Sequence, residues 1–387
     1  MEAIKRVCCF CQSWGSGGIE SFLHNVLLRI DLAWIQVDIV AEKLEKSIFT
    51  EPLLEHGVNF FELSGDMHSV WENYQRFRQL VQERQYDVLH LNIFQGMSLY
   101  YAHIAKEAGI PIRIAHSHNT DLRLTKTYRL KLRIHRFFCR RYAKDASEFW
   151  ACSKDAAKFM FPEKLLKKRG YSFIPNGIDR QRFQMDFLQR EMFREQNGWA
   201  DCFMVANIGR LCYQKNQAFL LDVLHELLPL RPESRLILIG EGEDKEMLQT
   251  KAASMGLLEK TIFYGTTDRI EELLWSVDVL AFPSLFEGFG IAALEAQAAG
   301  LPVLCSEFLP PEVHVSSLLR TVPLSGGVSQ WAKALQNVPI RRSAPEGVST
   351  DTWLVKDTAF DIAGVARQIE SAYLGADRQG GDTWYHT

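Results

Sequence analysis

The stretch VDVLAFPSLFEGFGIAALEAQAAGLPVLCS, residues 277–306, contains two apolar runs separated by a glycine-rich turn and an alanine-rich segment. Short apolar runs such as VDVLAFPS and LPVLCS are typical of buried strands, and IAALEAQAA is typical of a helix. A connecting helix allows two such strands to lie parallel in one sheet. The stretch therefore predicts an α/β fold in which a parallel sheet is covered on both faces.

The same alternation occurs along the chain in two series. The first series contains the apolar runs IKRVCCFC, WIQVDIVAE, DVLHLNIF, IPIRIAHSH and EFWACS. The second contains FMVANIGRL, SRLILIG, TIFYG, DVLAFPS and LPVLCS. Because segments with helical periodicity separate these runs, we predict two doubly wound, Rossmann-like domains with a junction near residues 193–201.

Composition and charge narrow the class of protein. The 387 residues are 47% hydrophobic and 24% charged, as in folded globular proteins, and a net charge of −3 argues against a nucleic-acid binder. Three of eight cysteines, Cys8, Cys9 and Cys11, crowd the first strand, where we expect small buried side chains rather than a metal site. This cysteine usage and the lack of a long apolar run predict a cytoplasmic protein without a signal peptide or membrane span.

Two glutamates in the opening stretch follow a predicted strand, where parallel sheets bind ligands. Glu287 lies among glycines, and Gly288 and Gly290 precede a helix that we expect to start near Ile291. Glu295 follows Glu287 by eight positions, so a helical step separates them by roughly 10 Å. A glycosidase pair is closer, at about 5 Å or about 6.5 to 9.5 Å. The spacing fits two hydroxyl-bearing groups of one ligand, such as a nucleotide-sugar, although two incidental glutamates at a helix start are the alternative.

Cations and glycines follow two other strands of the second series. Arg210 and Lys215 precede a helix that we expect to begin near Asn216. Fixed cations beside a helix N-terminus suit a diphosphate, and solvated loop cations are the alternative. Gly240 and Gly242 end another strand, where small residues allow the backbone to approach a ligand.

A glycine-rich turn, SWGSGGIE at residues 13–20, follows the first strand and includes Gly17 and Gly18. A dinucleotide-binding fingerprint would need glycine at position 20, where this chain has Glu20. Glu42, at the end of the second strand, has the position of a ribose-binding acid. A dinucleotide-dependent oxidoreductase therefore remains an alternative.

Two histidines end the strand IPIRIAHSH. A single histidine there is ordinarily structural, but His116 and His118 together favour a functional role for His116. A paired-histidine metal site is disfavoured, because no third ligand is evident nearby in the sequence.

Residues 126–144, KTYRLKLRIHRFFCRRYAK, contain eight lysines and arginines and no acidic residue. Leu130, Ile134, Phe137 and Phe138 recur at helical spacing, which predicts a basic amphipathic helix. Such a helix can lie on anionic lipid or steer a pyrophosphate-bearing acceptor. Alternatively, its apolar side packs onto the domain and its cations are solvated.

In their order along the chain, these motifs resemble those of GT-B glycosyltransferases. PSLFEGFGIAALEAQAAGLPV resembles the E-x7-E signature of the retaining family 4 enzymes, and NIGRLCYQKN resembles their diphosphate loop. IPNGID and ACSKDAAKF are similar to segments that close the first domain. GGIESFLHNVL and RIAHSHN resemble motifs of the bacterial capsule and exopolysaccharide branch. The resemblance covers residues 13–304, and FDIAGVARQIESAYL resembles the terminal helix that crosses back to the first domain.

The resemblance implies a GT-B fold, in which two Rossmann-like domains face a central cleft. An acceptor-binding domain would comprise residues 1–195 and a crossover helix at about 359–376, and a nucleotide-sugar domain would comprise residues 196–358. The implied reaction is retaining transfer of a hexose from a UDP-sugar to a hydroxyl of a glycan or lipid-pyrophosphate acceptor. It would need no metal or cofactor and would take place in the cytoplasm, with peripheral contact at the inner face of the plasma membrane. A non-catalytic GT-B subunit is the other alternative.

The resemblance also assigns roles to residues. Glu295 would hold the ribose, Glu287 the transferred sugar, and Arg210 and Lys215 the leaving diphosphate, while His116 would lie near the reacting carbon. The implied donor-binding set is Gly17, Gly18, Gly209, Arg210, Lys215, Gly240, Gly242, Glu287, Gly288, Phe289, Gly290, Ile291 and Glu295. His118 and Asn119 would contact the acceptor.

Overall fold

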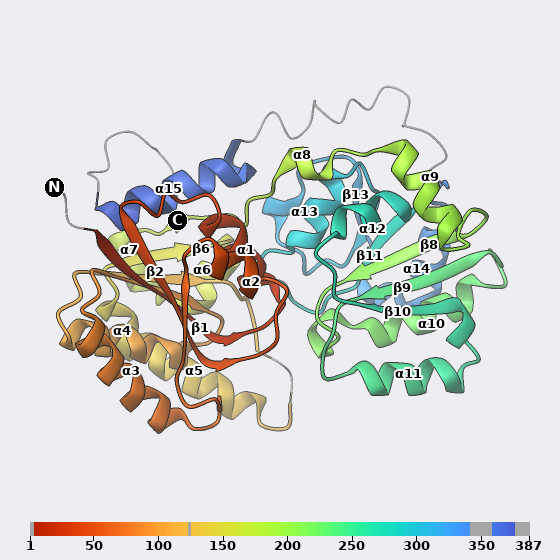
Figure 1. Ribbon diagram of the computed structural model, residues 1–387. Helices are drawn as coiled ribbons and strands as arrows, with labels where there is room; N and C mark the ends of the chain where they lie inside the picture. Colours follow the sequence, from red (N-terminus) through yellow and green to blue (C-terminus); the bar gives the residue numbers. More distant parts are fainter. Residues whose placement is uncertain (1–3, 123–124, 341–357, 376–387) are drawn as a thin grey trace. The chain divides into compact units, whose positions relative to one another are not determined.

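The computed structural model describes residues 4–122, 125–340 and 358–375, which form two compact units (Figure 1). The first unit comprises Met1–Gly177 and Ala359–Thr387, and the second comprises Ile178–Thr358. Each unit has one parallel sheet with helices on its faces. The prediction of two doubly wound α/β domains is confirmed.

The first sheet has seven strands in the order β3-β2-β1-β4-β5-β6-β7. The strands are β1 (Lys5–Trp14), β2 (Ile35–Leu44), β3 (Asn59–Glu62), β4 (Val88–Ile93), β5 (Ile112–Ser117), β6 (Glu148–Ala151) and β7 (Ser172–Phe173). Chain order reverses between β1 and β4. The loops that follow these two strands therefore diverge, which is the usual place for a ligand in an open parallel sheet.

Helices connect the strands of this sheet, and α3, α4 and α5 lie together on one side of it (Figure 1). The connecting helices are α1 (Gly18–Leu27), α2 (Thr50–Glu55), α3 (Val70–Arg84), α4 (Leu99–Glu107), α5 (Tyr128–Tyr142), α6 (Lys154–Met160) and α7 (Glu163–Arg169). The basic amphipathic helix predicted at residues 126–144 corresponds to α5.

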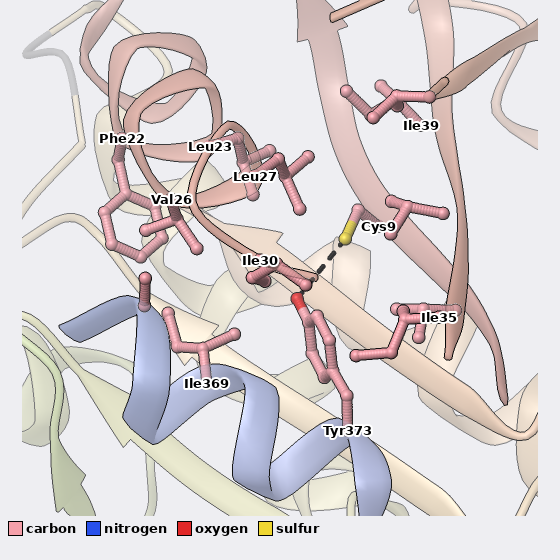
Figure 2. Close-up of a cluster of buried hydrophobic side chains, with 14 of the residues drawn as sticks. Cys9, Phe22, Leu23, Val26, Leu27, Ile30, Ile35, Ile39, Ile369 and Tyr373 are labelled. Carbon is pink, nitrogen blue, oxygen red and sulfur yellow. Dashed lines mark hydrogen bonds between the residues drawn. The ribbon is translucent and has the colours of Figure 1, made fainter. Parts of the chain in front are cut away.

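The C-terminal helix α15 (Ile362–Leu374) packs into the core of the first unit. Its apolar residues recur at helical spacing, and Ile369 and Tyr373 lie among side chains of α1 and of strands β1 and β2 (Figure 2). The Tyr373 hydroxyl oxygen lies 3.4 Å from the Cys9 Sγ atom. Cys8 and Cys11 are also buried, as the sequence predicts for this strand.

The second sheet has six strands in the order β10-β9-β8-β11-β12-β13. They are β8 (Phe203–Ile208), β9 (Ser234–Ile239), β10 (Thr261–Gly265), β11 (Val279–Phe282), β12 (Val303–Cys305) and β13 (Leu319–Thr321). The helices that cover them are α10 (Gln217–Leu227), α11 (Lys245–Ser254), α12 (Ile270–Ser276), α13 (Ile291–Ala298) and α14 (Gly327–Gln336). Chain order reverses between β8 and β11. The unit predicted from residues 277–306 is β11, α13 and β12, in which Leu280 pairs with Val303 in parallel register.

Two helices before β8, α8 (Arg180–Phe183) and α9 (Phe187–Gln196), belong to the second unit, although the sequence assigns residues 178–195 to the first domain. Buried Asp278 accounts for this placement. Its carboxylate lies 3.0 Å from a guanidinium nitrogen of Arg190 and 3.3 Å from one of Arg194, and it accepts a hydrogen bond from the Met204 amide. All three charged side chains are buried, so these contacts fix α9 to the second sheet.

We expect Asp278→Ala to lower the free energy of unfolding by roughly 3 kcal/mol or more, because two guanidinium groups would remain buried without their carboxylate. Urea denaturation of the full chain measures this loss. Asp222→Ala is the matched control, since Asp222 pairs with Lys251 at a partly exposed position and should cost less than about 1 kcal/mol. Equal losses in both variants would contradict this account of α9.

Candidate active site

In the second unit, the loops that follow β8 and β11 bring together two charged residues that the sequence singles out. Lys215 ends the 3₁₀ turn η3 (Tyr213–Lys215), and Glu287 lies between β11 and α13. The Lys215 Nζ atom lies 2.7 Å from the Glu287 Oε1 atom, and the two side chains are 16% and 5% exposed. This largely buried ion pair lies where the strand order reverses, at the position expected for a ligand.

Hydrogen bonds join these two loops on both sides of the ion pair. The Leu285 amide donates to the Gln214 carbonyl oxygen at 2.8 Å, and the Gln214 side-chain amide donates to the Phe286 carbonyl oxygen at 2.9 Å. Asn216, which has a left-handed backbone with φ +54°, donates to the Pro283 carbonyl oxygen. The loops therefore hold Lys215 and Glu287 at a fixed separation.

Close packing explains why glycine occupies three of the predicted donor-binding positions. A Cβ atom on Gly240 would lie 2.2 Å from the Gly209 carbonyl oxygen, and one on Gly242 would lie 2.3 Å from the Leu211 carbonyl oxygen. A Cβ atom on Gly209 would lie 2.9 Å from the Cε atom of Lys215. The loop after β9 thus packs directly against the loop after β8, and this packing supports the lysine.

Arg210 pairs with a carboxylate other than Glu287. Its Nε atom lies 3.1 Å from the Glu243 Oε2 atom, and its side chain is 58% exposed. Gly290, with φ +91°, caps α13, which begins at Ile291 as predicted. Gly288 and Phe289 lie in the loop that leads into this helix.

Glu295 lies on α13 and is 8% exposed. Burial raises its pKa to about 7, the positive charge of Arg182 lowers the pKa and the negative charge of Glu271 raises it. Arg182 donates to Glu271 at 2.9 Å, so these two residues form a charged neighbourhood for Glu295 that the sequence did not indicate. The only signal available was the position of Arg182 shortly after the IPNGID motif.

In the first unit, the rings of the two predicted histidines lie side by side, with their centroids 4.0 Å apart, but the histidines differ in burial. His116 is completely buried within β5, and its Nδ1 atom lies 3.2 Å from the Nε2 atom of His90. The other ring nitrogen of His90 lies 2.6 Å from the Tyr373 hydroxyl. Burial lowers the pKa of His116 well below its usual value. His116 is therefore a buried, neutral histidine, and its role near the reacting carbon stays a prediction.

His118 follows the end of β5 and remains partly exposed. Its Nε2 atom lies 3.0 Å from the Asn92 Oδ1 atom, while the Asn92 amide nitrogen faces the carbonyl oxygens of Phe10 and His90. This arrangement places the ring proton of His118 on Nε2 and the lone pair on Nδ1. Burial of the ring lowers the pKa of His118 to about 3, so the imidazole is neutral at physiological pH.

The sequence missed Asn92, for which the signal was a polar residue near the end of an otherwise apolar strand. Asn119 donates to the Phe94 and Asp121 carbonyl oxygens and holds the loop after His118.

The side chain of Glu20 fills part of the space beside the glycine-rich turn after β1. The Gly15 amide donates to this carboxylate at 3.2 Å, and a Cβ atom on Gly17 would lie 2.7 Å from it. The space around Gly18 is open: apart from Gly18, its two chain neighbours and the backbone of its own helix, no atom of the described residues lies within 4 Å of the position that a Cβ atom would take.

Glu42, the basis of the oxidoreductase alternative, is buried and accepts a hydrogen bond from the Tyr101 hydroxyl at 2.7 Å. Burial raises its pKa to about 7. Its carboxyl group faces the interior rather than a cofactor ribose, which weakens that alternative. Within the residues that the structure describes, no cluster of three metal-ligating side chains is present.

Two family models match this chain. The Glycosyltransferase Family 4 model matches residues 16–182, and the Glycosyl transferases group 1 model matches residues 189–317. The two ranges together span most of the chain and follow its two units. These matches identify the chain as a glycosyltransferase.

Individual relatives agree with this assignment. The putative glycosyltransferase EpsF of Bacillus subtilis (strain 168) is 28% identical to this glycosyltransferase over 96% of this chain and 95% of its own. The UDP-Gal:alpha-D-GlcNAc-diphosphoundecaprenol alpha-1,3-galactosyltransferase of Escherichia coli is 25% identical over 73% of each chain. Among solved structures, Anabaena HepE in complex with UDP and glucose matches with a TM-score of 0.68 at 21% identity, over 96% of this chain and 95% of its own. This structural neighbour confirms the GT-B fold.

We expect Lys215→Met and Glu287→Gln each to destabilise this glycosyltransferase by roughly 3 kcal/mol, because each leaves the other charge largely buried without a partner. The double variant should lose at least about 1 kcal/mol less than the sum of the single variants. Urea denaturation of all four proteins gives the coupling. The exposed Arg210→Met and Glu243→Gln pair is the control, with an expected coupling below about 0.5 kcal/mol. Additive losses at Lys215 and Glu287 would count against the ion pair.

The raised pKa of Glu295 predicts a pH-dependent gain in stability for Glu295→Gln. A carboxyl group whose pKa is about 7 in the folded protein contributes stability below its ordinary value of 4.5, and loses it as the pH rises through 7. The variant should therefore exceed the wild type by roughly 3 kcal/mol at pH 8 and by less than about 1 kcal/mol at pH 5. Urea denaturation at both pH values tests this, with exposed Glu246→Gln as the control. A pH-independent difference would show that Glu295 titrates normally.

Proposed function

We propose that this chain transfers a hexose, with retention of configuration, from a UDP-sugar to a hydroxyl group of a glycan or lipid-pyrophosphate-linked acceptor in polysaccharide biosynthesis. The observation that carries the proposal is the Lys215–Glu287 pair at the strand-order reversal of the second unit, directly before α13. The names of relatives support the donor and acceptor classes. The Escherichia coli relative is named for UDP-Gal and a diphosphoundecaprenol acceptor, and HepE was solved with UDP.

The second unit supplies groups for each part of such a donor. Glu287 accepts hydrogen bonds from sugar hydroxyls, and Lys215 offers its charge to the adjoining diphosphate. The first turn of α13 has backbone amides without acceptors in their own helix, which suit phosphate oxygens. Glu295 holds the ribose hydroxyls from the same helix.

In the reaction, the bond between the anomeric carbon and the diphosphate oxygen breaks, and the acceptor oxygen bonds to that carbon on the same face. The acceptor proton passes to the departing diphosphate, so UDP leaves and the configuration is retained. Lys215, Arg210 and the amides of α13 balance the charge that develops on the diphosphate, and no metal ion is required. In the first unit, the Nδ1 lone pair of His118 accepts a hydrogen bond from a hydroxyl group.

A panel of UDP-sugars and GDP-sugars tests the proposal through nucleotide release by the purified protein. We expect release from a UDP-sugar that persists in EDTA, and a product whose anomeric configuration by NMR matches that of the donor. Glu287→Gln and His118→Ala should each lower kcat/KM at least about 100-fold, because each removes a contact to the reacting sugars. Glu246→Gln should retain wild-type activity.

Three results would overturn parts of this proposal. Binding of UDP-sugars without turnover, with or without acceptor glycans, would identify a non-catalytic subunit. Activity that EDTA abolishes and Mg²⁺ restores would contradict the charge assignment. A product of inverted configuration would contradict the retaining mechanism.

A further inference from the structure

The short helix α8 holds Arg182 in a fixed position in the second unit. The Asp179 side chain accepts hydrogen bonds from the backbone amides of Gln181 and Arg182 and so caps the start of α8. Phe183 ends the helix as a buried residue, and its carbonyl oxygen accepts a hydrogen bond from the Trp275 indole nitrogen at 3.1 Å. These contacts fix the backbone from which the Arg182 side chain extends.

The guanidinium group of Arg182 is held at the start of α12. Its Nε atom donates to the Glu271 Oε2 atom at 2.9 Å, and a second guanidinium nitrogen lies 2.8 Å from the same oxygen. The group also donates to the Asp268 carbonyl oxygen. The side chains of Arg182 and Glu271 are 35% and 18% exposed, so this ion pair lies at the edge of the interior.

Glu295 lies near this pair because α8 packs against α13. The residue is 8% exposed, and among the residues that the structure describes, none donates a hydrogen bond to its carboxyl group or forms an ion pair with it. A nearly buried carboxyl group without a donor is costly, and the two neighbouring hydroxyls of a ribose would supply donors. The surroundings of Glu295 therefore suit a ligand better than a structural hydrogen bond.

Two charged groups act on the Glu295 carboxyl group in opposite directions. Burial raises the pKa of Glu295 to about 7, the positive charge of Arg182 lowers it, and the negative charge of Glu271 raises it. Besides α8, the elements packed against α13 are β11, β12 and the 3₁₀ turn η5 (Pro311–Val313). The titratable residues of these four elements are Arg180, Arg182, the neutral thiol Cys305 and Glu312. Arg182 is the cation that shifts the pKa of Glu295.

We propose that Arg182 is a positioning residue of the donor site, which keeps the Glu295 carboxylate ionised for the ribose hydroxyls, and that Glu271 limits this effect. This inference rests on the proposed function, since it concerns how the ribose of a nucleotide donor is held. An ionised carboxylate accepts hydrogen bonds from both hydroxyls, whereas a protonated carboxyl group uses one oxygen as a donor. The charge of Arg182 therefore sets the pH range in which UDP binds tightly.

Two single variants with opposite expected effects test this proposal by titration calorimetry with UDP. At pH 6, where roughly a tenth of Glu295 is ionised, Arg182→Met should weaken UDP binding about threefold or more. Glu271→Gln should tighten it about threefold or more, because the carboxylate then loses a negative neighbour. At pH 9 both variants should lie within about twofold of the wild type, since Glu295 is then ionised in each protein. Comparison at one pH cancels the titration of UDP itself.

Two kinds of control accompany these variants. Arg182→Lys keeps the positive charge and should stay within about twofold of the wild type at both pH values. Lys251→Met and Asp222→Asn each remove one charge of another partly exposed ion pair of the second unit and should leave UDP binding unchanged. A pair that only anchors α8 would make Arg182→Met and Glu271→Gln weaken UDP binding alike. Weaker binding in both, or effects that do not depend on pH, would overturn the proposal.

Urea denaturation without a ligand separates this inference from the proposed function. The gain in stability from Glu295→Gln at pH 8 should be larger in the Arg182→Met background and smaller in the Glu271→Gln background. Equal gains in the three backgrounds would overturn the proposal, because the charge of Arg182 would then not reach Glu295. Failure of the wild type to bind UDP, with these differences intact, would contradict the proposed donor and the ribose as the ligand of Glu295. It would still support the effect of Arg182 on the ionisation of Glu295.

Discussion

The ion pair between Lys215 and Glu287 depends on the arrangement of the whole second sheet. Neither charge is stable alone in a largely buried position, so each requires the other at hydrogen-bonding distance. That distance exists because β8 and β11 are neighbours although they are far apart in the chain. The glycines after β9 let a third loop pack against Gly209 and Leu211, in the loop that carries the lysine. The strand order of the sheet therefore sets the distance between Lys215 and Glu287. The close packing of the loops in turn requires glycine at the positions where they touch.

The two units have the same order of strands up to the reversal, but the groups at their strand ends differ in charge. The second unit presents an ammonium group, two carboxyl groups and a helix N-terminus, which suit a charged diphosphate and the sugars attached to it. The first unit presents the Glu20 carboxylate in the turn after β1 and, after β5, the neutral imidazole of His118, held in one tautomer by Asn92. A neutral acceptor of hydrogen bonds suits an uncharged hydroxyl group. This contrast supports a donor on the second unit and an acceptor on the first.

Several polar groups of this protein are buried at a cost to stability. Glu295 has a pKa of about 7 because its negative charge is poorly solvated. His118 has a pKa of about 3 because its positive charge would be poorly solvated too. Such shifts are common where side chains are positioned for a ligand rather than for the folded state alone. On α5, the exposure of the apolar side chains of Leu130 and Phe137 is a comparable cost.

The sequence by itself determined the parallel α/β architecture, the start of α13 at Ile291, and the placement of Lys215 and Glu287 after strands. These features follow from local periodicity and from the rule that ligands bind beyond strand ends, so no distant contact was needed. Only the tertiary structure decided that His116 is completely buried and His118 partly exposed, because two residues along one strand separate the interior from the strand end. It also decided which face of α5 is exposed, because the hydrogen bond between His135 and the Gly96 amide fixes the inward face. It assigned α9 to the second unit, because Asp278 pairs there with Arg190. These outcomes depend on partners distant in the chain, and periodicity does not identify them.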